Sequence, residues 1–208
     1  MPFRVEDAKT WLTSLNKVYQ QEKMYLTELD QAIGDGDHGI NMARGFHELS
    51  QRLEAVEYHD LGGLFKDAGM VLLSKVGGAS GPLYGTAFLK AAAPLKDKQE
   101  VSSVELASAL AEALEGLKLR GKASLLDKTM LDVWIPAIEY LQQHEKNVDW
   151  DEFIQLSQEK MEGTKELEAK KGRASYLGPR SVGHIDPGAA SSKFFFSELA
   201  KVCKGAQL

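Results

Sequence analysis

Three aspartates stand close together in one glycine-rich stretch, residues 30–39. Asp30 is followed by Asp35 and Asp37, and His38 comes directly after the last of them. Carboxylates this close raise one another's pKa unless a cation lies among them. Oxygen ligands on a flexible glycine loop suit Mg²⁺, Mn²⁺ or Ca²⁺, and not Zn²⁺. An isolated Asp-Gly-Asp is more often a solvated acidic turn, but the additional Asp30 and His38 favour a divalent-metal site.

Three familiar motifs are excluded on local grounds. An EF-hand loop starting at Asp35 would need an acidic residue at position 39 and a glutamate at position 46, which are Gly and Phe. The glycines of residues 34–39 match the spacing of a dinucleotide-binding turn, but a helical segment precedes them instead of a strand. Residues 116–122 lack the Ser or Thr that a P-loop needs at position 123.

Other glycine-bearing loops could bind anions. Residues 77–81 and residues 186–188 each lead into a helix, whose first N–H groups and dipole attract negative charge. Arg173 lies in the long late loop and could hold a phosphate in fork geometry. A smaller loop spans residues 121–129. One such helix start alone is more often simple capping, but together with the acid trio these segments form what a metal–polyphosphate site requires.

The elements that position these loops are helices. Apolar residues recur at three- and four-residue spacing almost throughout the chain, and no sustained period of two predicts a sheet. We expect about eight helices, the first over roughly residues 5–29 and the last a short one over residues 194–202. No proline- or serine-rich linker and no internal repeat divides the chain, so we predict one all-α domain over residues 1–208. We expect side-chain caps from Asp37, Ser80, Ser102 (with Glu105 in a capping box), Asp149 and Asp186.

The composition of the chain excludes several classes of protein. The chain has 208 residues, 26% charged and 43% hydrophobic, which are ordinary globular values. Its net charge of −5 argues against a nucleic-acid or acidic-membrane partner. Its one cysteine, Cys203, excludes an internal disulfide and a Cys-based zinc site and fits a reducing compartment. We see no signal peptide and no apolar run near the ~18 residues of a membrane helix, so we expect a cytoplasmic protein. No Ser/His/Asp or Cys/His set is recognisable, so we expect no covalent catalytic nucleophile.

Five blocks of the sequence resemble the nucleotide-binding L subunit of dihydroxyacetone kinase, the DhaL family. They are residues 29–39, 77–82, 127–130, 171–178 and 183–188, and they occur in that family's order. The resemblance implies an antiparallel up-and-down barrel of eight helices with the nucleotide at one end. It also implies that Asp30, Asp35 and Asp37 hold two Mg²⁺ ions against the phosphates. The nucleotide contacts that it implies are His38, Gly39, Ile40, Asn41, Ala79, Ser80, Gly121, Met130, Arg173, Asp186, Pro187 and Gly188.

The same resemblance implies a function. The chain is shorter than the single-chain, ATP-dependent relatives, so it is similar to the separate subunit of the phosphoenolpyruvate-dependent system. There, ADP/ATP is a tightly held coenzyme that a phosphohistidine of a DhaM-type subunit recharges, and dihydroxyacetone bound on a DhaK-type subunit receives the phosphoryl group. Relatives also point to a homodimer. Two alternatives stay open at this stage: a kinase subunit that uses free ATP, and a regulatory module that senses nucleotide state. Apolar spacing alone also leaves open whether the barrel holds a lipid.

Overall fold

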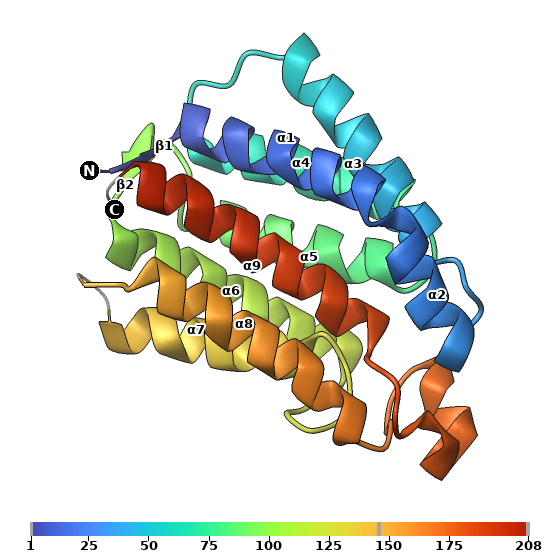
Figure 1. Cartoon of the computed structure of the whole chain (residues 1–208). Helices are drawn as coiled ribbons and strands as arrows, with labels where there is room; N and C mark the ends of the chain where they lie inside the picture. Colours follow the sequence, from blue (N-terminus) through green and yellow to red (C-terminus); the bar gives the residue numbers. More distant parts are fainter. Residues whose placement is uncertain (1, 145–146, 207–208) are drawn as a thin grey trace.

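Helices make up most of the chain, as the apolar spacing predicts (Figure 1). This computed structural model describes residues 2–144 and 147–206. Within these ranges, none of the helices is both long enough and apolar enough to cross a membrane. The α-helices are α1 (Val5–Gln21), α2 (Lys23–Ile33), α3 (His38–Ala55), α4 (Leu61–Lys75), α5 (Ser80–Ala92), α6 (Ser103–Gly121), α7 (Leu131–His144), α8 (Trp150–Gly163) and α9 (Pro187–Gly205).

The first two helices form one bent helix. At the bend, the N–H of Glu22 donates to the carbonyl of Val18 (2.8 Å) and its carbonyl accepts the N–H of Leu26 (2.9 Å). Counted in this way, the described chain has the eight long helical segments that were predicted, and two short 3₁₀ segments, η1 (Thr164–Glu166) and η2 (Arg173–Ser181), lie between α8 and α9. Each long segment packs against the next along the chain, and α9 returns to pack on α1. The ring of helices therefore closes into an up-and-down barrel.

Two expectations about secondary structure are wrong. A two-stranded antiparallel sheet exists, in which β1 (Phe3–Arg4) pairs with β2 (Glu100–Val101). Strands of two residues are too short to show a period of two in the sequence. The last helix, α9, is also much longer than predicted, with 19 residues. Its first turns bury serines, Ser191 and Ser192, where the apolar pattern would place hydrophobic residues.

Most helix starts follow the predicted capping, with two exceptions. Side-chain oxygens cap the first turns of α6, α8 and α9, and these caps come from Ser102, Asp149 and Asp186. Ser80 is instead the first residue of α5, and its hydroxyl lies 3.0 Å from a ring nitrogen of His38. Asp37 stands at the cap position of α3, but its side chain makes no capping bond there. The expectation of side-chain caps at Ser80 and Asp37 is therefore wrong.

Aromatic rings fill the interior of the barrel. The ring of Phe195 on α9 lies 4.7 Å from that of Trp11 and 4.9 Å from that of Trp134, centroid to centroid. The cavity left beside these rings measures about 10 Å³. A space of this size holds about one water molecule. This part of the barrel is therefore a packed core.

The up-and-down order brings alternate connections to the same end of the barrel. Residues 34–37, 76–79, 122–130 and 164–186 connect successive helix pairs at one end, the lower right of Figure 1. The described ends of the chain lie at the opposite end, near β1 and β2. The four connections at the first end include the glycine-rich segments that the sequence singles out. Topology alone therefore gathers these segments.

We expect Phe195→Ala to lower the free energy of unfolding by about 3–5 kcal/mol, because it opens a large cavity among rings that cannot close in on it. Urea denaturation followed by far-UV circular dichroism would measure the change. Leu119→Ala is the matched control, because Leu119 is 73% exposed and its loss should change stability by less than about 0.5 kcal/mol. Equal effects of the two substitutions would contradict the packed core.

Candidate metal and phosphate site

A cavity of about 530 Å³ opens at the end of the barrel where the four connections meet. Its walls come from the end of α2, the starts of α3, α5 and α9, the end of α6 and the connections between them. One side is acidic, one is the start of a helix, and one is apolar.

The acid trio, Asp30, Asp35 and Asp37, forms the acidic side. Each residue offers one carboxylate oxygen, and these oxygens all lie within 4.8 Å of one another. Asp30 is buried in the last turn of α2, Asp35 is exposed, and Asp37 is half-buried. Three oxygen donors converging in this way match the ligand type and spacing that Mg²⁺ and Ca²⁺ use. The donor set therefore fits a hard divalent cation.

Asp30 also shapes the loop that carries the other two acids. Its Oδ2 accepts the backbone N–H groups of Asp37 (2.8 Å) and His38 (3.0 Å). Burial and the neighbouring carboxylates raise the pKa of Asp30, and the two N–H bonds oppose this rise. The Oδ2 atom thus holds the start of α3, which leaves Oδ1 as the oxygen with fewer partners. Asp30 combines a structural role with that of a candidate ligand.

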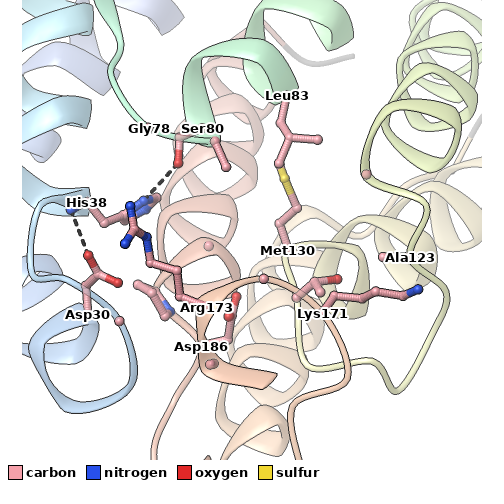
Figure 2. Close-up of a pocket in the computed structure, with 18 of the residues that line it drawn as sticks. Asp30, His38, Gly78, Ser80, Leu83, Ala123, Met130, Lys171, Arg173 and Asp186 are labelled. Atoms are coloured by element: carbon pink, nitrogen blue, oxygen red, sulfur yellow. Dashed lines mark hydrogen bonds between the residues drawn. The ribbon is translucent and has the colours of Figure 1, made fainter. Parts of the chain in front are cut away.

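Arg173 reaches the acid trio from the opposite wall. It follows Gly172 at the start of η2, and its guanidinium lies 2.8 Å from Oδ2 of Asp35. Both side chains are largely exposed, so this ion pair contributes little to stability. The ion pair matters for position, because it places the positively charged guanidinium of Arg173 beside the acidic side of the cavity. Figure 2 shows Arg173 extending across the cavity toward His38.

The second side is the start of α5. Gly78 precedes it with a φ of +63°, a conformation that L side chains rarely adopt. A Cβ added at Gly78 would lie 3.6 Å from a carboxylate oxygen of Asp37, so this loop packs directly on the acid trio. The first amides of α5 and the helix dipole therefore face the same space as the acids. A phosphate bridged to the acids by a cation would meet both groups.

A chain of buried hydrogen bonds ties this helix start to the core. His38 places Nδ1 at 3.0 Å from the hydroxyl of Ser80 and Nε2 at 3.0 Å from that of Ser191 (Figure 2 shows the first contact). The hydroxyl of Tyr84 contacts both Ser191 (2.9 Å) and Ser192 (3.1 Å), which also accepts the indole N–H of Trp134. Burial lowers the pKa of His38 to about 4. A neutral imidazole therefore orients the Ser80 hydroxyl.

The third side is apolar. Leu83 and Met130 point toward each other in Figure 2, with Ala123 beside them. Leu117 and Leu131 also line this part. The slot lies across the cavity from the acid trio, and its apolar lining suits a flat, weakly polar ring. The cavity is thus polar at one end and apolar at the other.

The structure brings most of the predicted residues to the cavity. Nine of the predicted nucleotide contacts line it: His38, Ala79, Ser80, Gly121, Met130, Arg173, Asp186, Pro187 and Gly188. Three others, Gly39, Ile40 and Asn41, are not among the residues that line it. Gly39 packs against α2, where a Cβ would lie 2.1 Å from the carbonyl of Lys23. Ile40 is exposed, and Asn41 accepts a bond from Arg44.

Several residues at the site carried no signal in the sequence. Ser191 contacts His38, and Tyr84 in turn contacts Ser191. Lys128, although inside a matched block, is buried at the cavity wall, where its ammonium donates to backbone carbonyls. Serines and tyrosines on a helix face are ordinary in any sequence, and a lysine is normally a surface residue. Only long-range contacts reveal these roles.

Comparison with known proteins agrees with this geometry. Residues 32–201 match the family described as the DAK2 domain. The chain belongs to this family. It is 47% identical over 199 residues to the Listeria innocua PEP-dependent dihydroxyacetone kinase 1, ADP-binding subunit DhaL, covering 96% of this chain and 97% of the relative. It is 44% identical to the Escherichia coli PEP-dependent dihydroxyacetone kinase, ADP-binding subunit DhaL, covering 93% and 95%. Within the DAK2 family the chain is a DhaL-type member.

A solved structure shares the fold. The dihydroxyacetone kinase from C. freundii, in complex with AMP-PNP and Mg²⁺, superimposes with a TM-score of 0.76 at 26% identity. The match covers 97% of this chain but only 34% of that longer chain. The all-α barrel predicted from the resemblance is therefore confirmed.

The burial of His38 makes a pH dependence testable. The unfolded chain takes up the proton near pH 6.5 and the folded chain only near pH 4, so unfolding is favoured between these values. The free energy of unfolding should fall by on the order of 3 kcal/mol as the pH drops from 6.5 to 4, and His38→Gln should abolish that part of the loss. Urea titrations across this range measure it. His47→Gln is the control, because His47 is an exposed histidine on the same helix, and it should show the same loss of stability as the wild type. Equal pH profiles for the wild type, His38→Gln and His47→Gln would refute the buried neutral imidazole.

Proposed function

We propose that this chain is the nucleotide-binding subunit of a cytoplasmic, phosphoenolpyruvate-dependent dihydroxyacetone kinase, a phosphotransferase active only with its partner subunits. One observation carries the proposal. The acid trio and the start of α5 lie next to each other at one end of a cavity whose far end is an apolar slot. A nucleoside diphosphate with its cations has the same order of parts. The names of the two DhaL relatives agree with this assignment.

The acid trio would hold two Mg²⁺ ions against the phosphates of ADP or ATP. Bound Mg²⁺ would supply the positive charge that lets carboxylates and phosphates share one site. Two ions are proposed on the basis of charge. The negative charge of three carboxylates and a diphosphate exceeds the positive charge of Arg173 and one divalent ion. Asp30, Asp35 and Asp37 would supply the oxygens, and Ser80 and the first amides of α5 would contact phosphate. Leu83 and Met130 would enclose the base.

The proposed reaction passes a phosphoryl group through the bound nucleotide. A DhaM-type subunit would donate it from a phosphohistidine, and dihydroxyacetone on a DhaK-type subunit would receive it. This chain's residues would position the phosphates and offset their charge; none would form a covalent intermediate. The arrangement of His38 supports this, because both of its ring nitrogens already have hydroxyl partners. We also propose that residues 1–208 form one such domain, and a homodimer stays a prediction of the family resemblance.

Asp35→Asn should weaken Mg²⁺-dependent ADP binding by about a hundredfold or more, because even outer partners of a metal change its affinity by ~10–100-fold. Isothermal titration with ADP, with and without Mg²⁺, would measure this. Asp97→Asn is the matched control, since Asp97 is an exposed acid outside the cavity. Wild-type affinity in Asp35→Asn, with unchanged circular dichroism, would count against the metal site.

The relay is tested by comparing phosphoryl donors. With DhaK- and DhaM-type partners and stoichiometric amounts of this chain, phosphoenolpyruvate with the phosphotransferase components should sustain many turnovers of dihydroxyacetone. Excess ATP without that relay should support little more than one turnover, because the nucleotide is retained. Efficient multiple turnovers on ATP alone would instead establish a kinase subunit that uses free ATP. Failure of both donors, with tight ADP binding, would favour a module that senses nucleotide state.

A further inference from the structure

Lys128 is a buried lysine whose ammonium, among the described residues, bonds only to backbone carbonyls. Its side chain is 1% exposed at the wall of the cavity, in the connection between α6 and α7. Its Nζ donates to the carbonyls of Thr164 (2.7 Å), Leu167 (3.0 Å) and His184. Three acceptors require three N–H donors, and only the charged ammonium has three. Burial lowers the pKa of Lys128, and the nearby Asp186 carboxylate opposes this.

The three carbonyls belong to both ends of one long connection. Thr164 and Leu167 lie at its start, in and just after η1, and His184 lies at its end, shortly before α9. One ammonium therefore joins the start of residues 164–186 to their end. A further bond joins the same two connections in the opposite direction: the N–H of Lys170 donates to the carbonyl of Asp127 (3.0 Å). Between these points the connection carries Arg173 and the other residues that cover the acidic side of the cavity.

The segment that presents Lys128 is itself held under strain. Leu126 and Lys128 have φ values of +67° and +59°, which cost free energy for residues with a Cβ. The buried carboxylate of Asp132 accepts the N–H groups of Leu126 (2.5 Å) and Thr129 (2.7 Å) and so fixes the turn. Such strain persists only where the surroundings impose it. Here it aims one lysine side chain away from solvent and into the cage of three carbonyls.

We propose that Lys128 is a positioning residue that fastens residues 164–186 over the cavity and thereby slows release of the bound nucleotide. Its ammonium takes the place of a bound cation among the three carbonyls. It contacts neither the acid trio nor Arg173, so it acts on retention and not on metal affinity. The effect of Lys128 on nucleotide release rests on the proposed function. Its role in holding residues 164–186 in place does not.

Lys128→Met tests both statements, because it keeps the length of the side chain and removes the donors. Leaving buried carbonyls without a partner should speed hydrogen exchange of the amides of residues 165–186 and the dissociation of ADP, each by about tenfold or more. Binding of Mg²⁺ to the ADP-free protein should stay unchanged. Lys122→Met is the matched control: Lys122 lies in the same connection, also with positive φ, but is exposed.

Lys128→Ala can be tested for rescue by small cations, which would not occur if Lys128 acted only through the packing of its side chain. Ammonium or potassium ions at high concentration should slow ADP release and hydrogen exchange in this variant, because the carbonyl cage can accept a small cation. Tetramethylammonium at equal ionic strength should not, and none of the salts should affect Lys122→Met in this way. Wild-type exchange rates in Lys128→Met, or identical effects of all three salts on Lys128→Ala, would overturn the proposal. If wild-type protein fails to bind ADP, the proposed function fails, while the exchange rates still test the fastening.

The wild-type protein provides a test that does not depend on variants that fold. Acetylation by a lysine-selective reagent, followed by mass spectrometry, should modify Lys128 far more slowly than Lys122. Equal rates at the two lysines would overturn the proposal, because they would show that the ammonium is free to leave its cage.

Discussion

Three carboxylates held within 4.8 Å of one another constrain everything around them. Such a group is tolerated only where positive charge or N–H donors are aimed at it. The protein supplies these from separate places: two backbone amides to Asp30, the guanidinium of Arg173 to Asp35, and the dipole of α5 nearby. Glycine at position 78 lets the loop before α5 approach Asp37 closely. The acid trio therefore constrains the start of α3, the loop before α5 and the position of Arg173.

The interior of the barrel is packed with aromatic side chains, whereas one end of the barrel is polar. Rings around Phe195 pack its centre, so the helices are rigid supports and the chemistry is confined to the connections. α9 serves both parts. Its first turns carry the serines that support His38 and, through it, Ser80, while its later turns carry the aromatic core. α9 is polar in its first turns and aromatic beyond them. It therefore couples the stability of the core to the geometry at the start of α5.

The fourth connection is held differently from the first two. Residues 34–37 and 76–79 are short and are held by the helices that flank them, whereas residues 164–186 form a long excursion with two short 3₁₀ segments. Long connections have high conformational entropy and need tethers to stay in place. Lys128 and Asp127 provide such tethers through bonds to backbone groups of this connection.

The helical class, the acid trio and the glycine-rich loops can be predicted from the amino-acid sequence, because helix period, carboxylate spacing and glycine content are local properties of the chain. The five matched blocks then led to the family, which the comparisons confirm. The tertiary structure alone decided the pairing of β1 with β2, the length of α9, and the position of Gly39, Ile40 and Asn41 outside the cavity wall. It alone revealed the partners of His38 and Lys128, which are more than 35 residues away along the chain. Such contacts depend on which helix ends meet in space, and local spacing carries no information about that.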